Sequence, residues 1–156
     1  GTVGLMAFLP AVLDVVEGRP ILAAGGIMDE TTVRAAMSMG ADGVWVGTIF
    51  VAAEESMAHE IYKRRLIEAC ADDAELLTGY SFGWKFGTPH RAIKSKLRFN
   101  HLRFVSGGAR VVDSPLFAER LTLYAGQGVG KITEVLPTKE IVRRLERGLD
   151  RERPHR

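Results

Sequence analysis

Cysteine is almost missing from this sequence, because Cys70 is the only one among 156 residues. A single cysteine excludes an internal disulfide and is typical of a reducing compartment, so we expect a cytoplasmic protein. Its neighbours Ile67 and Ala71 indicate that Cys70 is a buried helix residue. No apolar run approaches the length of a membrane span and no signal peptide is visible, so no membrane partner is expected.

A strong net charge is missing as well. The formal net charge is +2, which is too small to predict a polyanionic partner. One stretch nevertheless lacks acid: between Leu76 and Val112 there is no Asp or Glu, and seven Lys or Arg alternate with aromatic residues. That mixture is typical of single-strand nucleic-acid binding, but equally of a lid or packing segment near an anionic ligand. We expect no nucleic acid, because no stacking motif at module spacing accompanies the charge.

Motifs for metal and nucleotide binding are also absent. His59 has no Cys or His at ligand spacing, so it is interpreted as a surface residue and no metal site is predicted. The run Gly126-Gln127-Gly128-Val129-Gly130-Lys131 has neither the P-loop spacing nor the G-x-G-x-x-G spacing. Glu54 and Glu55 are adjacent on an expected helix and therefore do not face the same way, so they form no acid–base pair.

What is present begins with two short apolar runs, Ile21–Ala24 and Val44–Val46, each followed by a turn of small residues. Helical spacing with a glycine stop lies between them, with Asp29 as the expected N-cap. Strands this short with a helix between them predict a right-handed crossover in a parallel sheet. The fold class is therefore α/β.

The two turns are Gly25-Gly26 and Gly47-Thr48. In a parallel sheet the carboxyl ends of neighbouring strands lie side by side, so the two turns are expected to converge. Glycine lets a ligand approach the backbone, and the helix near residues 29–32 is expected to offer free N–H groups. This arrangement predicts a phosphate cradle, and in a (β/α)8 barrel it belongs to the loops after strands 7 and 8.

In the rest of the chain, the spacing of apolar residues and the helix caps predict further helices and a strand. A helical segment is expected over Leu5–Val16, with the helix proper starting near Leu9 so that Pro10 is in its first turn. Another helix is expected over Ser56–Ala71. A strand is expected at Glu75–Thr78, followed by an irregular region from Gly79. Helices are then expected over Ser114–Tyr124 and Lys139–Leu149, with a frayed end at Asp150–Arg156.

Three motifs resemble a known family. The runs L-P-x-V-x-D-V-V, P-I-L-A-A-G-G-I and G-A-D-G-V-W-V-G-T-x-F-V-A-x-E-E-S, followed by Y-K, look like the nitronate monooxygenase (2-nitropropane dioxygenase) family. The FMN-dependent enoyl-acyl-carrier-protein reductases share the same segments. The resemblance covers about the first half of the chain and returns weakly at A-G-Q near Gln127. It implies the C-terminal part of a (β/α)8 TIM barrel with parallel strands, plus a C-terminal helical extension.

The resemblance also implies a division of the chain and a cofactor. Residues 1–79 would be the end of an FMN-binding barrel, 80–113 a basic-aromatic loop or lid, and 114–156 a helical region. FMN would be held at Gly25, Gly26, Gly47 and Thr48, with Trp45 and Val46 beside its ring or its ribityl chain. Trp45 stands where many members carry glutamine, and a core role is the competing interpretation. Gln127 is either near the flavin or in a helix–helix turn.

The implied activity is the oxidation of alkyl nitronates with O2, a small-molecule reaction in which flavin carries the electrons. The family's catalytic histidine would fall immediately before Gly1, so the catalytic residues of this chain are unknown and the chain alone is expected to be weak or inactive. An enoyl-acyl-carrier-protein reductase and a non-catalytic phosphate-binding module remain alternatives. A part of a barrel exposes an edge and an apolar face, so we expect pairing with the missing N-terminal portion or with a second copy.

Overall fold

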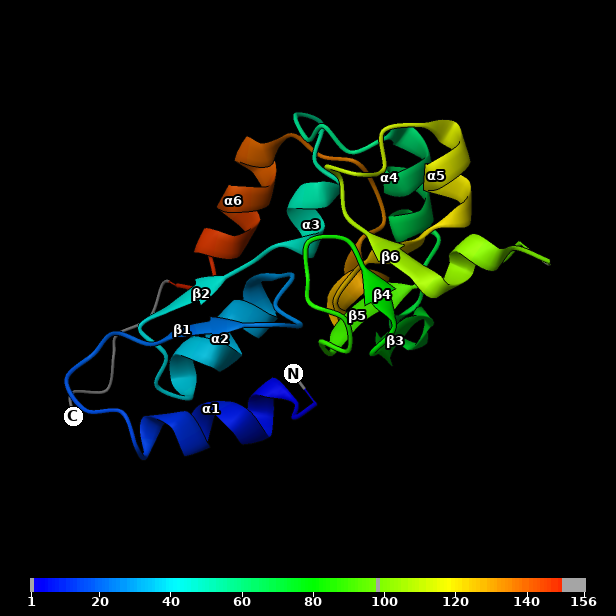
Figure 1. Ribbon diagram of the computed structural model, residues 1–156. Coiled ribbons are helices and arrows are strands. Elements are labelled where there is room, and N and C mark those ends of the chain that lie inside the picture. Colours follow the sequence, from blue (N-terminus) through cyan, green and yellow to red (C-terminus); the bar gives the residue numbers. More distant parts are fainter. Residues whose placement is uncertain (1, 98, 150–156) are drawn as a thin grey trace.

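The computed structural model describes residues 2–97 and 99–149 and has a mixed α/β fold with two sheets (Figure 1). One sheet pairs β1 (Leu22–Ala24) with β2 (Gly43–Trp45). The other has the order β3-β5-β7-β6-β4, built from β3 (Ala74–Leu77), β4 (Tyr80–Ser81), β5 (His90–Ile93), β6 (Val105–Gly107) and β7 (Thr122–Tyr124). The helices are α1 (Leu5–Leu13), α2 (Glu30–Ser38), α3 (Thr48–Val51), α4 (Glu60–Ile67), α5 (Pro115–Arg120) and α6 (Thr138–Glu146), with 3-10 turns η1 (Ala71–Asp73), η2 (His101–Phe104) and η3 (Gln127–Lys131). The end predicted to fray, 150–156, lies outside the described residues.

β1 and β2 are parallel and α2 connects them, so the predicted strand–helix–strand unit is confirmed. Leu22 pairs with Gly43, and Ala24 pairs with Trp45. Because side chains alternate along a strand, Ala23 is buried under the helices while Leu22 and Ala24 stay exposed on the opposite face. One face of this sheet is therefore packed, and the other is open.

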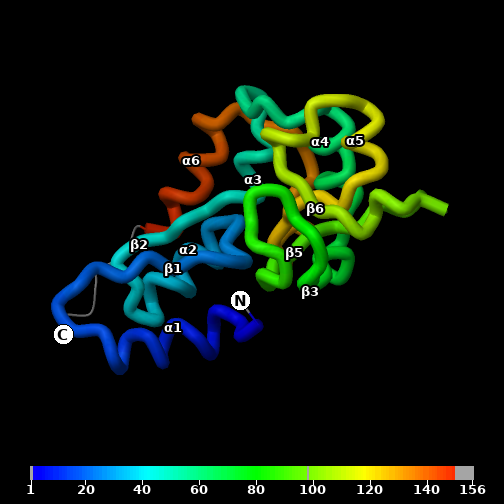
Figure 2. The backbone as a smooth tube through the Cα atoms, in the orientation of Figure 1, coloured from blue at the N-terminus to red at the C-terminus, as the bar shows by residue number. Residues whose placement is uncertain are grey.

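A helical layer covers the packed face. Asp29 caps α2 as predicted, and Val33 and Ala36 are its buried residues. α6, close to the end of the described chain, returns to contact α2 and α3 (Figure 2). The resulting core contains Leu9, Ala23, Ile27, Val33, Ala36, Ala41, Ala53, Ile141 and Leu145.

The first helix differs from its prediction. α1 begins at Leu5, so Pro10 is not in the first turn but is its sixth residue. Proline lacks the N–H that would bond to the preceding turn, which weakens a helix at that point. α1 ends at Leu13, where the Asp14 N–H still donates to the Pro10 carbonyl at 3.0 Å.

The second sheet is where sequence reasoning was wrong. Residues 80–113 are not an irregular loop, because they form β4, β5 and β6 with η2 between them. β5 is antiparallel to β3 and β7, while β6 is parallel to β4 and β7, so the sheet is mixed rather than parallel. The strand predicted at Glu75–Thr78 is confirmed as β3, shifted by one residue.

Three further predictions in this half were wrong. The helix expected over Ser56–Ala71 is only α4, which begins after His59, whose ring nitrogen accepts the Ile61 N–H. Cys70 is exposed rather than buried, since it lies at the start of η1. The helix expected over Ser114–Tyr124 divides into α5, capped by Ser114, and the buried strand β7.

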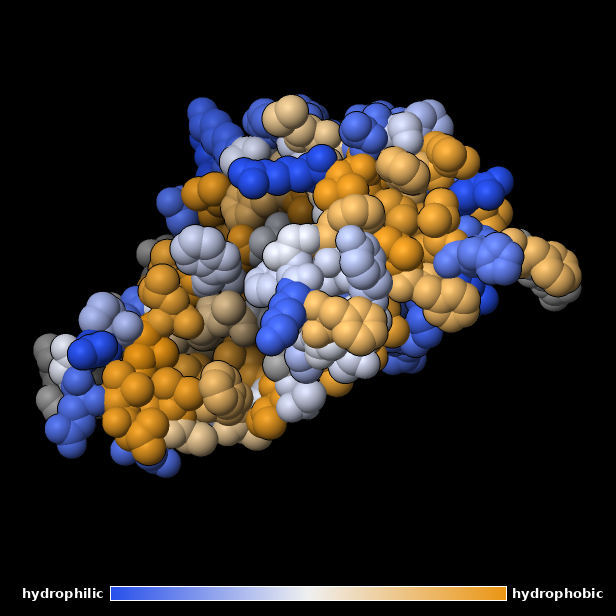
Figure 3. All heavy atoms as spheres, in the orientation of Figure 1, coloured by the Kyte–Doolittle hydropathy of each residue, from blue (hydrophilic) through white to orange (hydrophobic). Residues whose placement is uncertain are grey.

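Large apolar side chains remain exposed near the first sheet, including Met6 and Phe8 of α1, Val15, Leu22 and Trp45. Figure 3 shows apolar side chains gathered on the α1 side of the molecule. Exposed apolar side chains gathered on one face are typical of a surface that another polypeptide covers. Within the described part of the chain, no helix combines the length and the apolar character needed to cross a membrane.

Candidate functional site

The first wall of the site is the Gly25-Gly26 turn at the carboxyl end of β1. Their φ angles are 101° and 75°, a left-handed conformation that favours glycine over any residue with a Cβ. A Cβ built on either residue would meet no atom within 4 Å, so space is open in front of both. The backbone of this turn is therefore accessible to a ligand.

The second wall is Gly47-Thr48 at the end of β2. Gly47 precedes α3, and a Cβ there would again meet nothing within 4 Å. Thr48 Oγ1 accepts a hydrogen bond from the Gly126 N–H at 3.0 Å. A hydroxyl that accepts one bond keeps its own proton, so Thr48 can still donate to a ligand.

The third wall is a loop that the list of predicted site residues lacks. A Cβ at Gly126 would lie 3.5 Å from Thr48 Oγ1 and 4.0 Å from the Gly26 nitrogen. Gly128 is tighter still, since its Cβ would be 2.1 Å from Met28 Cγ and 3.3 Å from the Gly26 carbonyl oxygen. The glycines spaced by two in Gly126–Gly130 were the signal for this close approach. Gln127 itself is exposed and starts η3, so its turn joins a strand to a 3-10 helix and not two helices.

We call Gly25, Gly26, Gly47, Thr48 and Gly126 the glycine cradle. The helix beside it, α2, offers fewer free N–H groups than predicted. Its N-terminus is closed by a capping box in which Thr32 N–H donates to Asp29 Oδ1 at 2.9 Å. The donors of the cradle are therefore its glycine turns and the Thr48 hydroxyl more than this helix end.

The negative charge of the Asp29 carboxylate is partly balanced by Lys131. Burial raises its pKa, but hydrogen bonds from Thr32 and the nearby Lys131 ammonium outweigh burial, so the pKa lies below its usual value. Lys131 Nζ is 3.5 Å from Asp29 Oδ2. This pairing reduces the repulsion that an isolated carboxylate would exert on an anion in the cradle.

Trp45 and Val46 lie between the two turns. Trp45 ends β2 and its side chain is 70% exposed, so it packs in no core within the described chain. Whether it fills the barrel or lies beside the flavin stays a prediction. Its register partner is Ala24, so the indole is on the open face directly before the Gly25-Gly26 turn. Val46 is half-buried and packs on the core of the first sheet.

A cavity of about 410 Å³ opens beside the cradle, between α3 and the second sheet. We call it the cradle cavity. Its walls are mostly apolar or aromatic, and no carboxylate is among its lining residues. The lining is Gly47, Thr48, Val51, Tyr62, Trp84, Pro89, His90, Arg91, Gly108, Ala109, Tyr124, Ala125 and Gly126. Six of these, from Trp84 to Ala109, come from the segment expected to be a loop or lid.

His90 is the histidine of this cavity, but its nitrogens are already bonded. Nδ1 is 2.9 Å from the Thr88 carbonyl oxygen, which can only accept, so Nδ1 carries a proton. Nε2 is 2.8 Å from the Ser106 hydroxyl, and the ring packs edge-on against Tyr124. His90 therefore holds β5 and β6 together across β7 and does not present a free base.

The two tyrosines of the cavity also have structural bonds. Tyr62 donates its hydroxyl proton to the Tyr124 carbonyl at 2.6 Å, and Tyr124 donates to the Phe82 carbonyl at 2.8 Å. Burial raises the pKa of both phenols, so both stay neutral at physiological pH. They shape the wall and leave anion binding to other groups.

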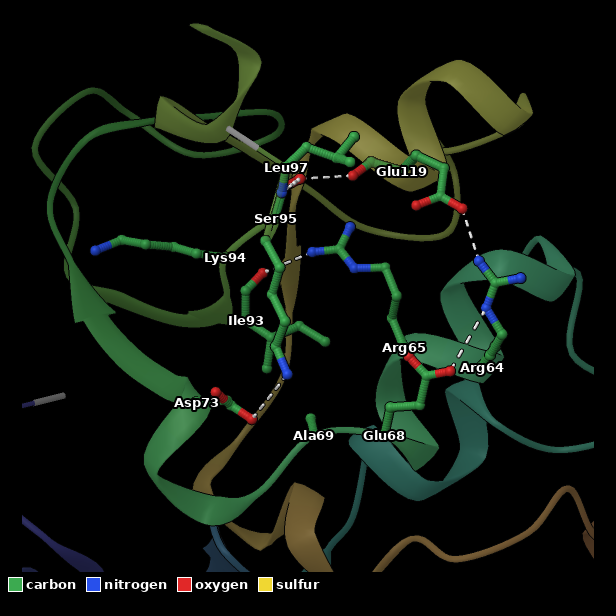
Figure 4. A pocket seen from close by; sticks show the side chains of 11 residues that line it. Arg64, Arg65, Glu68, Ala69, Asp73, Ile93, Lys94, Ser95, Leu97 and Glu119 are labelled. Carbon is green, nitrogen blue, oxygen red and sulfur yellow. Dashed lines mark hydrogen bonds and ion pairs between the residues drawn. The ribbon is translucent and has the colours of Figure 1, made fainter. Parts of the chain in front are cut away.

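A second pocket, of about 180 Å³, lies between α4, α5 and the end of β5 (Figure 4). Arg64 pairs with Glu119 and Glu68, and Lys96 lies 4.0 Å from Asp73. Arg65 points across this pocket and donates to backbone carbonyls, including that of Ile93. Because its charges pair with one another, this pocket is a packing feature and not the candidate site.

Comparison with known proteins gives the family of the chain. The family model for nitronate monooxygenase matches residues 1–104. The chain belongs to the nitronate monooxygenase family. A probable nitronate monooxygenase of Bacillus subtilis (strain 168) is 29% identical over 151 residues, which are 92% of this chain and 43% of that protein. The chain thus spans less than half of this relative.

Two solved structures are also similar to this chain over most of its length. Nitroalkane oxidase from Streptomyces ansochromogenes matches with a TM-score of 0.71 and 30% identity, over 94% of this chain and 44% of that one. FabK from Thermotoga maritima matches with a TM-score of 0.71 and 28% identity, over 95% and 49%. Both matches extend through the second sheet, so the 80–113 segment shares their fold.

Proposed function

We propose that the protein is an FMN-dependent oxidoreductase of nitronate monooxygenase type and that the glycine cradle holds the phosphate of FMN. One observation carries the proposal: two glycine turns with open space in front of them end neighbouring parallel strands. Among the described residues, neither the Gly25 nor the Gly26 N–H donates to a turn or loop acceptor. Each charge-assisted bond from such a group to a phosphate is worth about 1.5–3 kcal/mol.

The neighbouring residues fit the remainder of the cofactor. Trp45 is exposed on the open face next to the cradle, where an indole can lie against a flat ring. Val46 supports the same strand end from the core side. Bound FMN would supply the electron transfer, and the protein would hold and orient it.

We infer that the substrate is an alkyl nitronate oxidised with O2, in keeping with family membership. We assign the base that removes a substrate proton to a residue outside the described chain, because both ring nitrogens of His90 are already bonded. The chain by itself is therefore expected to bind flavin but to turn over nitronate weakly or not at all. Turnover by this chain at the rate of the full-length protein would contradict that assignment.

We propose that the chain forms the end of a TIM barrel, whose remainder covers the open face of β1 and β2. The exposed side chains of Leu22 and Trp45 share this face, and they would be inside a closed barrel. In the absence of that remainder, a second copy of the chain is the expected partner. Analytical ultracentrifugation tests this, since a monomeric chain at high concentration would contradict the proposal.

An enoyl-acyl-carrier-protein reductase is the second candidate, supported by the likeness to FabK. A direct comparison separates the two: the full-length protein is given a nitronate with O2, or an enoyl thioester with NAD(P)H. We expect oxygen consumption in the first assay. NAD(P)H oxidation only in the second would favour the reductase, and flavin-free phosphate binding with neither reaction would indicate a non-catalytic module.

Two basic residues of the 80–113 segment have carboxylates close to them, which weakens the case for nucleic-acid binding. Lys94 forms an ion pair with Glu75, and Lys96 lies near Asp73, both from the acidic stretch before β4. These carboxylates lower the positive charge that a phosphate backbone would meet. Salt-dependent binding of single-stranded DNA would contradict this view.

A further inference from the structure

Arg91 is the one Lys or Arg, among the described residues of the 80–113 segment, that lines the cradle cavity. It lines the cradle cavity together with Thr48 and Gly126. Lys94 and Lys96 both have carboxylates close to them. Among the described residues, no carboxylate forms an ion pair with Arg91, and its guanidinium donates only to the Ala74 carbonyl at 3.2 Å.

The position of Arg91 is fixed by the same loop that completes the cradle. The Ala125 N–H donates to the Arg91 carbonyl at 3.2 Å, and Ala125 is followed by Gly126, whose N–H bonds to Thr48. Register within the second sheet also pairs Arg91 with Leu76 of β3. Arg91 is therefore held at a constant place beside the cradle and not on a mobile tip.

We propose that Arg91 is an oxyanion-binding residue of the cradle cavity. A half-buried guanidinium without a carboxylate is left with most of its charge unbalanced, and the cavity wall holds no acid to balance it. A guanidinium has five N–H donors in a planar fork that matches phosphate and carboxylate, and one bond to a carbonyl leaves donors free. The ligand is the phosphate of a bound flavin or an anionic group of a second ligand, and the two sources are separable.

The first test needs no flavin, so it stands apart from the proposed function. The wild-type chain and its variants are titrated with inorganic pyrophosphate by calorimetry at low salt. Arg91→Gln should weaken binding about 10- to 100-fold, and Arg91→Lys less, because lysine keeps the charge but loses the fork. Arg120→Gln is the matched control, since it removes the same charge from an exposed residue of α5 that does not line the cavity. Equal affinity of wild type and Arg91→Gln, or no binding by either, would overturn the inference.

The second test identifies the source of the anion and does rest on the proposed function. The same proteins are titrated with FMN and with riboflavin, which lacks the phosphate. If Arg91→Gln loses affinity for FMN but not for riboflavin, Arg91 binds the flavin phosphate. Equal flavin affinities together with a weakened pyrophosphate affinity assign it to a second ligand. Glutamine can still donate to the Ala74 carbonyl, and thermal melting of each variant verifies that folding is preserved. Failure of the wild type to bind either flavin would count against the proposed function. The pyrophosphate titration would then decide the proposal about Arg91.

Discussion

Gly126 donates its N–H to the hydroxyl of Thr48 at 3.0 Å, which joins two loops that are far apart in the sequence. Thr48 begins α3, shortly after β2 of the first sheet, and Gly126 follows β7, the middle strand of the second sheet. This bond holds the two sheets at the point where the glycine cradle opens. Binding and stability should therefore be coupled at Thr48.

Thr48→Val tests this bond with almost no change in shape. Valine cannot accept a hydrogen bond, so the half-buried Gly126 N–H loses its acceptor, and the free energy of unfolding should fall by about 1–2 kcal/mol. Thr48→Ser keeps the hydroxyl and should stay within about 0.5 kcal/mol of wild type. Urea denaturation measures both, and equal loss in the two variants would show that the methyl group rather than the bond is what matters.

Gly128→Ala should disturb the cradle from behind. The new Cβ would be 2.1 Å from Met28 Cγ, so the loop or the Met28 side chain must move, at an expected cost of about 1–3 kcal/mol in unfolding free energy. Met28→Ala removes the clashing atoms, so Gly128→Ala should cost clearly less in that background. A double-mutant cycle measured by urea denaturation gives the answer, and additive effects would rule out this contact as the cause.

Arg65 should contribute more to stability than its neighbour Arg64. Its guanidinium donates to the carbonyls of Ala118 at 2.7 Å and Leu121 at 2.9 Å, and so joins α4 to the end of α5. Arg65→Met leaves buried carbonyls without a donor and should lower the unfolding free energy by about 2–4 kcal/mol. Arg64→Met breaks only exposed ion pairs and should cost less than about 1 kcal/mol. Equal melting temperatures for the two variants would contradict this role.

Asp29 should make the stability of the chain depend on acid. Its pKa is lower in the folded chain than in the unfolded one, so the folded state favours the ionised carboxylate. That contribution is present above the unfolded pKa, about 3.9, and is lost as the pH falls through the folded value. Asp29→Asn keeps a cap acceptor but cannot ionise, so the wild type should be the more stable at pH 7, by less than about 1 kcal/mol after screening. Unfolding in urea at about pH 7 and about pH 3 compares them, and a difference that does not shrink in acid would contradict the assignment.

The local unit around the cradle was predictable because its signals are short-range. The apolar runs, the Asp29 cap and the glycine turns each depend on neighbours within a few residues, and the structure confirms β1, α2 and β2 as predicted. The second sheet was not predictable in the same way. β4 has only two residues, and β5 and β6 owe their pairing to β7, which follows later in the chain. Such pairings depend on long-range contacts, which cannot be predicted from the local pattern of apolar and polar residues.

The cradle was predicted only in part for the same reason. Gly25, Gly26, Gly47 and Thr48 were found because neighbouring parallel strands must end together. Gly126 comes from the other sheet, so its approach to Thr48 could not be read from periodicity. Arg91 was noted in the sequence only as one member of a basic segment. The carboxylates that pair with Lys94 and Lys96 come from residues before that segment, so the sequence did not show which basic residues are paired.

The most direct test of the proposed site is to compare the affinity of the chain for FMN with its affinity for riboflavin. The visible spectrum and equilibrium dialysis of the purified chain report both. If the glycine cradle holds the phosphate, FMN should bind at about one per chain and at least about tenfold tighter than riboflavin. Gly47→Ala should remove that preference. The variant should stay folded, since the new Cβ meets no protein atom within 4 Å. Equal affinity for the two flavins, or a chain that stays colourless after incubation with FMN, would contradict the central claim.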